Sequence, residues 1–68
     1  MELKDALRVQ MEEKGFTVAR LARETGIKYE YLRLDLSGKR RMTGCELLKV
    51  LRVLDLSLED TYESVFGD

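Results

Sequence analysis

Residues 17–38, TVARLARETGIKYEYLRLDLSG, decide the fold of this chain because their pattern predicts two short helices that meet at Gly26. Leu21 and Ala22 lie on the inner face of the first helix, and Leu32 lies on the inner face of the second. A small residue allows two helices to approach closely, and glycine allows the tight turn between them. This spacing is typical of a helix-turn-helix, in which the two helices cross at a steep angle.

Local signals predict where these two helices begin and end. Thr17 has the side chain and the position of an N-cap, which predicts the first helix over residues 18–25. The second helix is expected over residues 28–36 and is followed by Gly38, a residue that commonly ends helices. The two helices together account for the whole of the quoted stretch.

Three more helices are expected, one before this unit and two after it. Apolar residues recur every four positions at Leu3, Leu7 and Met11, which predicts a helix over residues 2–14. Two capping signals follow the unit, T-x-x-E from residue 43 and S-x-x-D from residue 57. They predict a fourth helix, apolar on more than one side and therefore the most buried, and a last helix over residues 58–65.

Length and composition indicate a single all-α domain, residues 1–68. The chain is 44% hydrophobic, has no proline and contains five glycines, which favours compact helical structure. It has no histidine and one cysteine, so neither a structural zinc site, nor an internal disulfide, nor histidine-based catalysis is expected. We therefore expect no enzyme activity, no cofactor and no small-molecule substrate. Cys45 is expected to face inward as a small apolar group, with a reactive thiol as the alternative.

The sequence also indicates the compartment in which the protein acts. No apolar run is long enough to span a bilayer, and the first ten residues, MELKDALRVQ, lack the apolar region of a signal peptide. The single cysteine fits a reducing compartment. We therefore expect a cytoplasmic protein that does not bind membranes.

Charge is distributed unevenly along the chain, although the net charge is only −1. Residues 17–41 carry a net charge of +4, whereas residues 42–68 carry a net charge of −4. A locally basic surface attracts a polyanion even when the whole molecule is nearly neutral. The basic middle of the chain therefore favours nucleic acid as a partner.

A resemblance to a known family is carried by residues 16–60, FTVARLARETGIKYEYLRLDLSGKRRMTGCELLKVLRVLDLSLED. The order of LAxxxGI, YL, SGKRR, a capped apolar helix and a short last helix resembles the phage Cro/repressor-type helix-turn-helix family, also called the xenobiotic-response-element type. The resemblance implies an all-α, five-helix, lambda-repressor-like domain that binds double-stranded DNA through the major groove. It also implies that the start of the third helix reads the bases, at positions that match Lys28, Tyr29, Glu30, Arg33 and Leu34.

Three positions depart from the pattern of this family. Val18 stands where a phosphate-binding glutamine is common, so that contact would pass to Thr17 or Arg20. Lys28 stands in place of a serine cap, which weakens the helix start but offers a phosphate contact. Asp35 stands where an inward aliphatic residue is usual. Either the helix ends early and Asp35 is solvated, or Asp35 pairs with a nearby arginine.

The candidate base-reading residues also have competing structural roles. The Arg33 guanidinium can bond a guanine edge, or it can form a surface ion pair with Glu30. Glu30 can accept from a cytosine amino group or remain a surface charge. Tyr29 is expected to bond a phosphate or to pack on a thymine methyl. Leu34 contacts DNA unless a rotated or shortened helix turns it into the core.

Three consecutive cations, Lys39, Arg40 and Arg41, follow the third helix in an exposed loop. In this fold such a loop lies along the DNA backbone, where cations supply sequence-independent affinity by neutralising phosphates. The alternative is a solvated loop that keeps the protein soluble. We favour phosphate binding because the cations directly follow the expected reading helix.

The last helix offers a candidate dimer contact at Tyr62, Val65 and Phe66. The alternative, favoured for Tyr62, is that these side chains close the core against the first helix. A small domain gains affinity by binding two half-sites about 34 Å apart as a homodimer.

The sequence therefore predicts a regulator of phage or mobile-element type, a repressor that binds a palindromic operator as a dimer. The alternative function is a protein-interaction module of the same fold, such as an antirepressor or antitoxin-like partner, which the acidic C-terminal part favours.

Overall fold

The computed structural model describes residues 1–67. Within that range it contains five helices: α1 (Leu3–Glu13), α2 (Val18–Thr25), α3 (Tyr29–Ser37), α4 (Gly44–Leu54) and α5 (Leu58–Phe66). Each helix predicted from the sequence is present, and the described residues contain no strand. The all-α, five-helix architecture is therefore confirmed.

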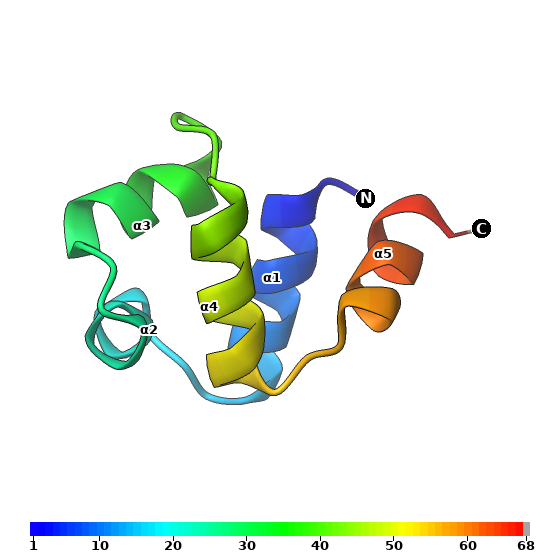
Figure 1. Ribbon diagram of the computed structural model, residues 1–68, viewed down its shortest axis with the longest axis horizontal. Coiled ribbons are helices and arrows are strands. Elements are labelled where there is room, and N and C mark those ends of the chain that lie inside the picture. The colour runs from blue at the N-terminus through cyan, green and yellow to red at the C-terminus, as the bar shows by residue number, and fades with distance from the viewer. Residues whose placement is uncertain (68) are drawn as a thin grey trace.

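The helices surround a small common core. Figure 1 shows α4 crossing in front of α1, with α2 and α3 on one side and α5 on the other. The principal contacts join α1 to α3 and α5, and join α2 to α3 and α4. The corner between α2 and α3 therefore rests on both α1 and α4, while α5 is attached to the opposite side of α1.

The core consists of the apolar faces that the sequence pattern predicts. Its buried members are Ala6, Leu7, Met11, Leu21, Ala22, Ile27, Leu32, Leu36, Val50, Leu51 and Leu54. Helix α4 differs from the prediction because it buries only one face, and Leu48 on another face is exposed. Cys45 is also exposed rather than inward. At about 100° per residue, Cys45 lies on the side of α4 opposite Leu54.

Side-chain caps define three of the helix starts, as predicted. The Thr17 hydroxyl accepts a hydrogen bond from the Arg20 amide at 3.1 Å. Thr43 and Glu46 form a reciprocal capping box, with bonds of 3.1 and 3.0 Å. The Ser57 hydroxyl caps α5 by accepting a hydrogen bond from the Asp60 amide at 2.9 Å. These bonds satisfy backbone donors that have no partner inside the helix.

Helix α4 ends at a residue that is unusual for its backbone conformation. Asp55 has a φ of 56°, in the left-handed region, and its amide and that of Leu56 bond back to carbonyls of the last turn. This conformation favours glycine, and a carboxylate at a helix C-terminus is electrostatically unfavourable. We expect Asp55→Gly to raise the free energy of unfolding by about 0.5 kcal/mol, as measured by urea denaturation.

Asp55→Ala is the matched control for this prediction. It removes the same charge but keeps a β-carbon in the left-handed region, so it should lower the stability rather than raise it. Equal stabilisation by the two substitutions would show that the charge, and not the backbone conformation, limits stability at this position.

Candidate nucleic-acid interface

The corner between α2 and α3 is built by local hydrogen bonds and by buried anchors. Gly26 ends α2 with a φ of 77°, a left-handed conformation that glycine adopts without strain. The Thr25 hydroxyl donates to the Leu21 carbonyl at 2.7 Å and accepts from the Ile27 amide at 3.2 Å. Ile27 and Leu32 are buried and attach α3 to the core. The predicted helix-turn-helix is therefore present, and Thr25 stabilises its turn, a role that the sequence pattern alone did not reveal.

Helix α3 is held to α1 at its other end. Arg8 donates from Nη1 to the Leu36 carbonyl at 3.0 Å, so a cation lies at the C-terminus of α3. This position is favourable because carbonyls without helical partners carry partial negative charge there. The contact spans 28 residues of sequence, which explains why local pattern did not predict it.

The candidate base-reading residues lie along the outer side of α3. Tyr29, Glu30 and Arg33 are exposed, as is Ser37 one turn later. Arg33 pairs with Glu30 through two hydrogen bonds, one of them from Nε at 3.4 Å. The hydrogen bond and the charge of Arg33 lower the pKa of Glu30. The surface ion pair predicted as an alternative is thus present, and its exposure leaves the Arg33 guanidinium able to exchange partners.

Lys28 and Thr17, the cation and the hydroxyl expected to bind phosphate near the helix starts, are also exposed. Lys28 forms the N-terminal boundary of α3 without a side-chain cap, as its departure from the usual serine suggested, and its ammonium lies 5.5 Å from the centre of the Tyr31 ring. Thr17 uses its oxygen as an acceptor to cap α2, so its hydroxyl hydrogen is still available to donate. Both residues keep the chemistry that a phosphate contact needs.

The structure decides between the two alternatives that the sequence leaves open for Asp35, a solvated carboxylate or one paired with an arginine. Helix α3 continues past it to Ser37, and Asp35 is only 4% exposed, so the solvated alternative is wrong. Its Oδ1 accepts from Arg40 Nη1 at 2.7 Å, which confirms the predicted pairing with an arginine. Its Oδ2 is buried without a hydrogen-bond partner among the described residues. Burial raises the pKa of Asp35 above its ordinary value, against the opposing hydrogen bond from Arg40.

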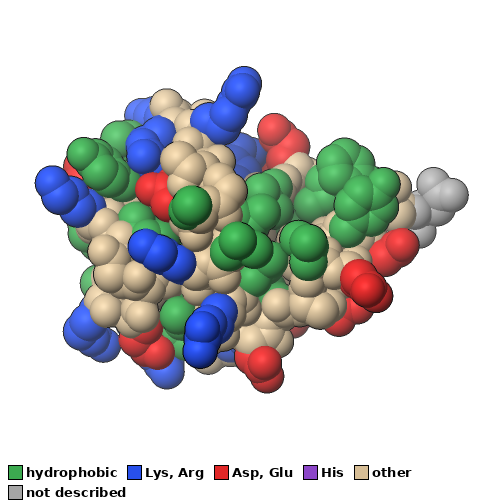
Figure 2. Space-filling view, viewed as in Figure 1, with side chains coloured by type: hydrophobic (Ala, Val, Ile, Leu, Met, Phe, Trp, Pro, Cys, Tyr) green, Lys and Arg blue, Asp and Glu red, His purple; other side chains and the backbone are tan. Residues whose placement is uncertain are grey.

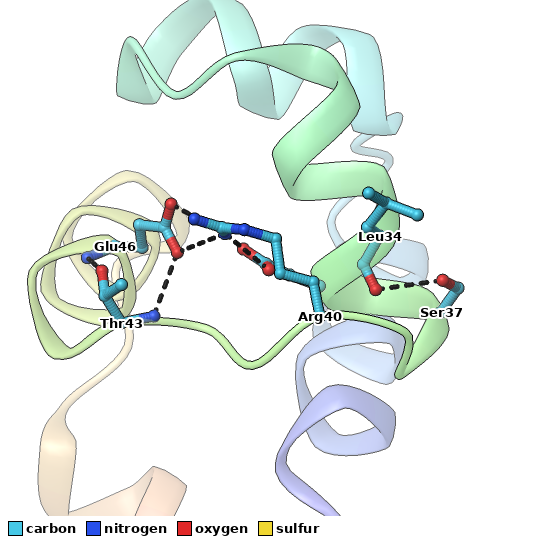
Figure 3. A network of polar contacts seen from close by, with 6 residues as sticks. Leu34, Ser37, Arg40, Thr43 and Glu46 are labelled. Carbon is cyan, nitrogen blue, oxygen red and sulfur yellow. Dashed lines mark hydrogen bonds and ion pairs between the residues drawn. The ribbon is translucent and has the colours of Figure 1, made fainter.

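The loop after α3 therefore presents two exposed cations rather than three. Lys39 and Arg41 are exposed as predicted. Arg40 was expected to be exposed with them, but it turns inward, and its Nη1 also lies 2.9 and 3.1 Å from the two carboxylate oxygens of Glu46 (Figure 3). Its guanidinium carbon lies 4.5 Å from the centre of the Tyr31 ring. The buried carboxylate of Asp35 accounts for this inward position, because a buried charge requires a partner.

Glu46 has a second role in the same cluster. Its carboxylate accepts from the Thr43 amide in the capping box as well as from Arg40 (Figure 3). Burial pushes the pKa of Glu46 upward, but the hydrogen bonds from the Thr43 amide and from Arg40 outweigh it, so the pKa lies below its ordinary value. Arg40, Asp35 and Glu46 thus form one ionic cluster between α3 and the start of α4, which we call the Arg40 clamp.

Leu34 lies at the margin between the exposed side of α3 and the core. Its side chain is half-buried, so it belongs to both surfaces. Its carbonyl accepts from the Ser37 hydroxyl at 3.0 Å (Figure 3). The same carbonyl also accepts from the amides of Lys39 and Arg40. These bonds close the C-terminus of α3 and start the basic loop directly beside it.

The residues proposed for a dimer contact form an exposed apolar face on α5. Tyr62 and Phe66 are 59% and 70% exposed, and their ring centroids lie 4.9 Å apart. The core role favoured for Tyr62 is wrong, because Thr61 occupies the buried position of this helix. Val65 is half-buried. A shallow groove of about 180 Å³ is lined by Leu3, Leu47, Leu58, Thr61, Tyr62, Val65 and Phe66.

The surface is polarised in the way that the sequence indicates. On the face shown in Figure 2, most lysine and arginine side chains lie over α2, α3, α4 and the loop between α3 and α4, whereas acidic side chains gather beside α5 next to the exposed apolar area. Within residues 1–67, no group of metal-ligating side chains is present. None of the described helices has the length and apolar character needed to cross a bilayer.

The comparison with known families agrees with this geometry. A family model for the Cro/C1-type helix-turn-helix DNA-binding domain matches residues 6–66. The chain belongs to this family. The match includes the whole helix-turn-helix and the basic loop, and it confirms the resemblance found in the sequence. Neither a curated protein nor a solved structure matches the chain. As a Cro/C1-type domain, the protein is a DNA-binding regulator.

Proposed function

We propose that this Cro/C1-type domain is a sequence-specific repressor that reads a palindromic operator with the outer side of α3. The observation that supports this most is the exposed row of hydrogen-bonding side chains on α3, directly followed by exposed cations in the next loop. A helix carrying such side chains fits the major groove, where each base pair presents a distinct set of donors and acceptors. Occupancy of the operator would exclude polymerase, with no enzymatic step.

Each side chain of this surface has a role that fits its chemistry. Base contacts are assigned to Tyr29, Glu30, Arg33 and the exposed edge of Leu34. Phosphate contacts, which position the protein without reading sequence, are assigned to a separate group. That group comprises Thr17, Lys28, Lys39 and Arg41. A protein that reads DNA acts in the compartment that holds the DNA, in keeping with the cytoplasmic location expected from the sequence.

A second copy of the chain is the proposed occupant of the apolar face on α5. A single domain with so few phosphate contacts binds weakly at cellular salt, whereas two linked half-sites multiply the affinity. Acidic residues flank this face on α5, at Glu59, Asp60 and Glu63, and basic residues lie on α4, at Lys49 and Arg52. These opposite charges favour self-association if a two-fold axis brings α5 of one copy toward α4 of the other.

The exposed apolar groove on α5 also supports a second function, protein interaction, and an experiment must distinguish it from DNA binding. The exposed groove beside Tyr62 and Phe66 could bind another protein, as the antirepressor or antitoxin-like alternative requires. Selection of bound duplexes from a random pool, with the mass of the complex measured, distinguishes the two. We expect a palindrome to be recovered and two chains to be present per duplex. Failure to enrich any duplex would favour the protein-interaction function.

Substitution of one reading residue should change sequence preference rather than general affinity. Arg33→Ala removes a guanidinium that can bond a guanine edge through two donors, so preference at one base position should fall by about 1–3 kcal/mol. The measurement is a comparison of operators that carry single base changes. Lys39→Ala is the matched control and should weaken all sequences equally. If Arg33→Ala leaves the preferred sequence unchanged, Arg33 does not read a base.

A further inference from the structure

The Arg40 clamp joins two helices that have no principal packing contact with each other. Helix α3 packs on α1 and α2, and α4 packs on α2, but α3 and α4 are not among the strongly packed pairs. Arg40 connects them directly, because it bonds Asp35 on α3 and Glu46 in the first turn of α4. It also covers the Tyr31 ring of α3. One side chain therefore links the expected reading helix to the capping box of α4.

We propose that Arg40 is a positioning residue for DNA recognition: the Arg40 clamp fixes the orientation of α3 in the major groove, and Arg40 itself does not contact DNA. This inference rests on the proposed function of α3 as the reading helix. Base contacts require side chains to be placed accurately, so a small change in the tilt of α3 weakens specific binding. Contacts to phosphate along the loop tolerate such a change better, because they carry no sequence information.

The charges of the cluster keep Arg40 away from the DNA backbone. Its side chain is 29% exposed, and it is the shared partner of two carboxylates, of which Asp35 is almost fully buried. Turning Arg40 outward to a phosphate would leave both carboxylates without their cation, and the Asp35 carboxylate would be buried and unpaired. Lys39 and Arg41 have no such constraint, because both are exposed and neither makes an ion pair among the described residues.

Two conservative substitutions test the clamp without removing a buried partner. Glu46→Gln keeps a side chain that can complete the capping box but removes the charge that faces Arg40. Arg40→Lys keeps a cation near Asp35 but cannot reproduce the planar fork that serves several acceptors. Both variants should remain folded at 25 °C, which thermal unfolding checks before any binding measurement. Lys39→Ala is the comparison for a direct phosphate contact.

The readouts are the ratio of specific to non-specific duplex affinity and the dependence of affinity on salt. For Glu46→Gln and Arg40→Lys we expect the ratio to fall roughly tenfold while the slope of log K against log salt stays at the parent value. For Lys39→Ala we expect a shallower slope and an unchanged ratio. An unchanged ratio in both clamp variants, or a slope reduced as in Lys39→Ala, would overturn the proposal.

Amide hydrogen exchange in the free protein separates failure of this proposal from failure of the proposed function. In Glu46→Gln, exchange at the amides of Leu34, Asp35 and Leu36 should accelerate several-fold relative to the parent, while exchange in α1 stays the same. Equal rates in α3, or equal acceleration in α1 and α3, would show that the clamp does not hold α3. If the parent binds no duplex although α3 exchange responds, the DNA-reading role is what fails.

Discussion

Arg40→Ala should strongly destabilise the folded domain, because it leaves the Asp35 carboxylate buried without its cation. Asp35 is 4% exposed, and its Oδ2 already has no hydrogen-bond partner among the described residues. Removal of the cation that pairs with a buried carboxylate is strongly destabilising, and water entering the space left by the partly exposed arginine would reduce the cost only in part. Thermal unfolding should therefore show a midpoint lower by roughly 10 °C or more.

A second substitution provides the control for this prediction. Asp35→Leu removes the carboxylate from the core, and a hollow of about 270 Å³ that Asp35 lines gives the larger side chain room. In this background Arg40→Ala should cost much less, because no unpaired buried charge is left. Equal costs of Arg40→Ala in the parent and in Asp35→Leu would contradict an ion pair with Asp35 as the source of the destabilisation.

The same effect should depend on pH. The folded-state pKa of Asp35 is raised, chiefly by burial, so the folded protein binds a proton more readily there than the unfolded chain does. Removal of Arg40 takes away a group that lowers this pKa. Between the raised pKa of the folded state and the pKa of about 4 in the unfolded chain, the contribution of Asp35 to the free energy of unfolding increases as the pH falls. The deficit of Arg40→Ala relative to the parent should therefore shrink as the pH approaches 4.

The second large effect is expected at the apolar face of α5. Replacing both Tyr62 and Phe66 by serine should convert a dimer to a monomer and lower operator affinity roughly a hundredfold, because the second half-site no longer adds to the first. Stability should change little, since both side chains are mostly exposed. The substitutions leave the charge unaltered, so a loss of affinity cannot come from weaker attraction to phosphate.

Mass measurement and operator binding together check this prediction. Val9→Ser is the matched control, because Val9 is an exposed apolar residue on α1 that does not line the α5 groove. It should leave both the mass and the affinity at the parent values. A parent that is monomeric on its operator, or a double variant that stays dimeric, would exclude this face as the dimer contact.

The sequence predicts the helices well because their signals are local. Thr17, Thr43 and Ser57 each cap the helix that follows, as the side chain and position of Thr17 and the T-x-x-E and S-x-x-D motifs predict. Gly26 adopts the left-handed conformation that the corner requires. These features depend on neighbours within four residues, and the pattern of the chain contains them in full.

The parts that the sequence does not predict depend on distant partners. Asp35 stands out in the pattern as a charge at an inward position, yet which arginine pairs with it depends on the path of the loop after α3. Arg40 therefore looks identical to its neighbours Lys39 and Arg41 until the structure separates them. In α5, Tyr62 and Thr61 are adjacent and lie about 100° apart around the helix. The packing of α5 on α1 decides that Thr61 is the buried one.

Salt-dependent duplex binding tests most directly whether the chain binds DNA through α3 and the cations beside it. At about 50 mM salt the parent should bind duplex DNA, and the affinity should fall steeply as the salt is raised to about 200 mM, because bound phosphates release counterions. Lys39→Ala combined with Arg41→Ala should reduce the salt slope. Absence of measurable binding to any duplex at 50 mM salt would contradict the claim.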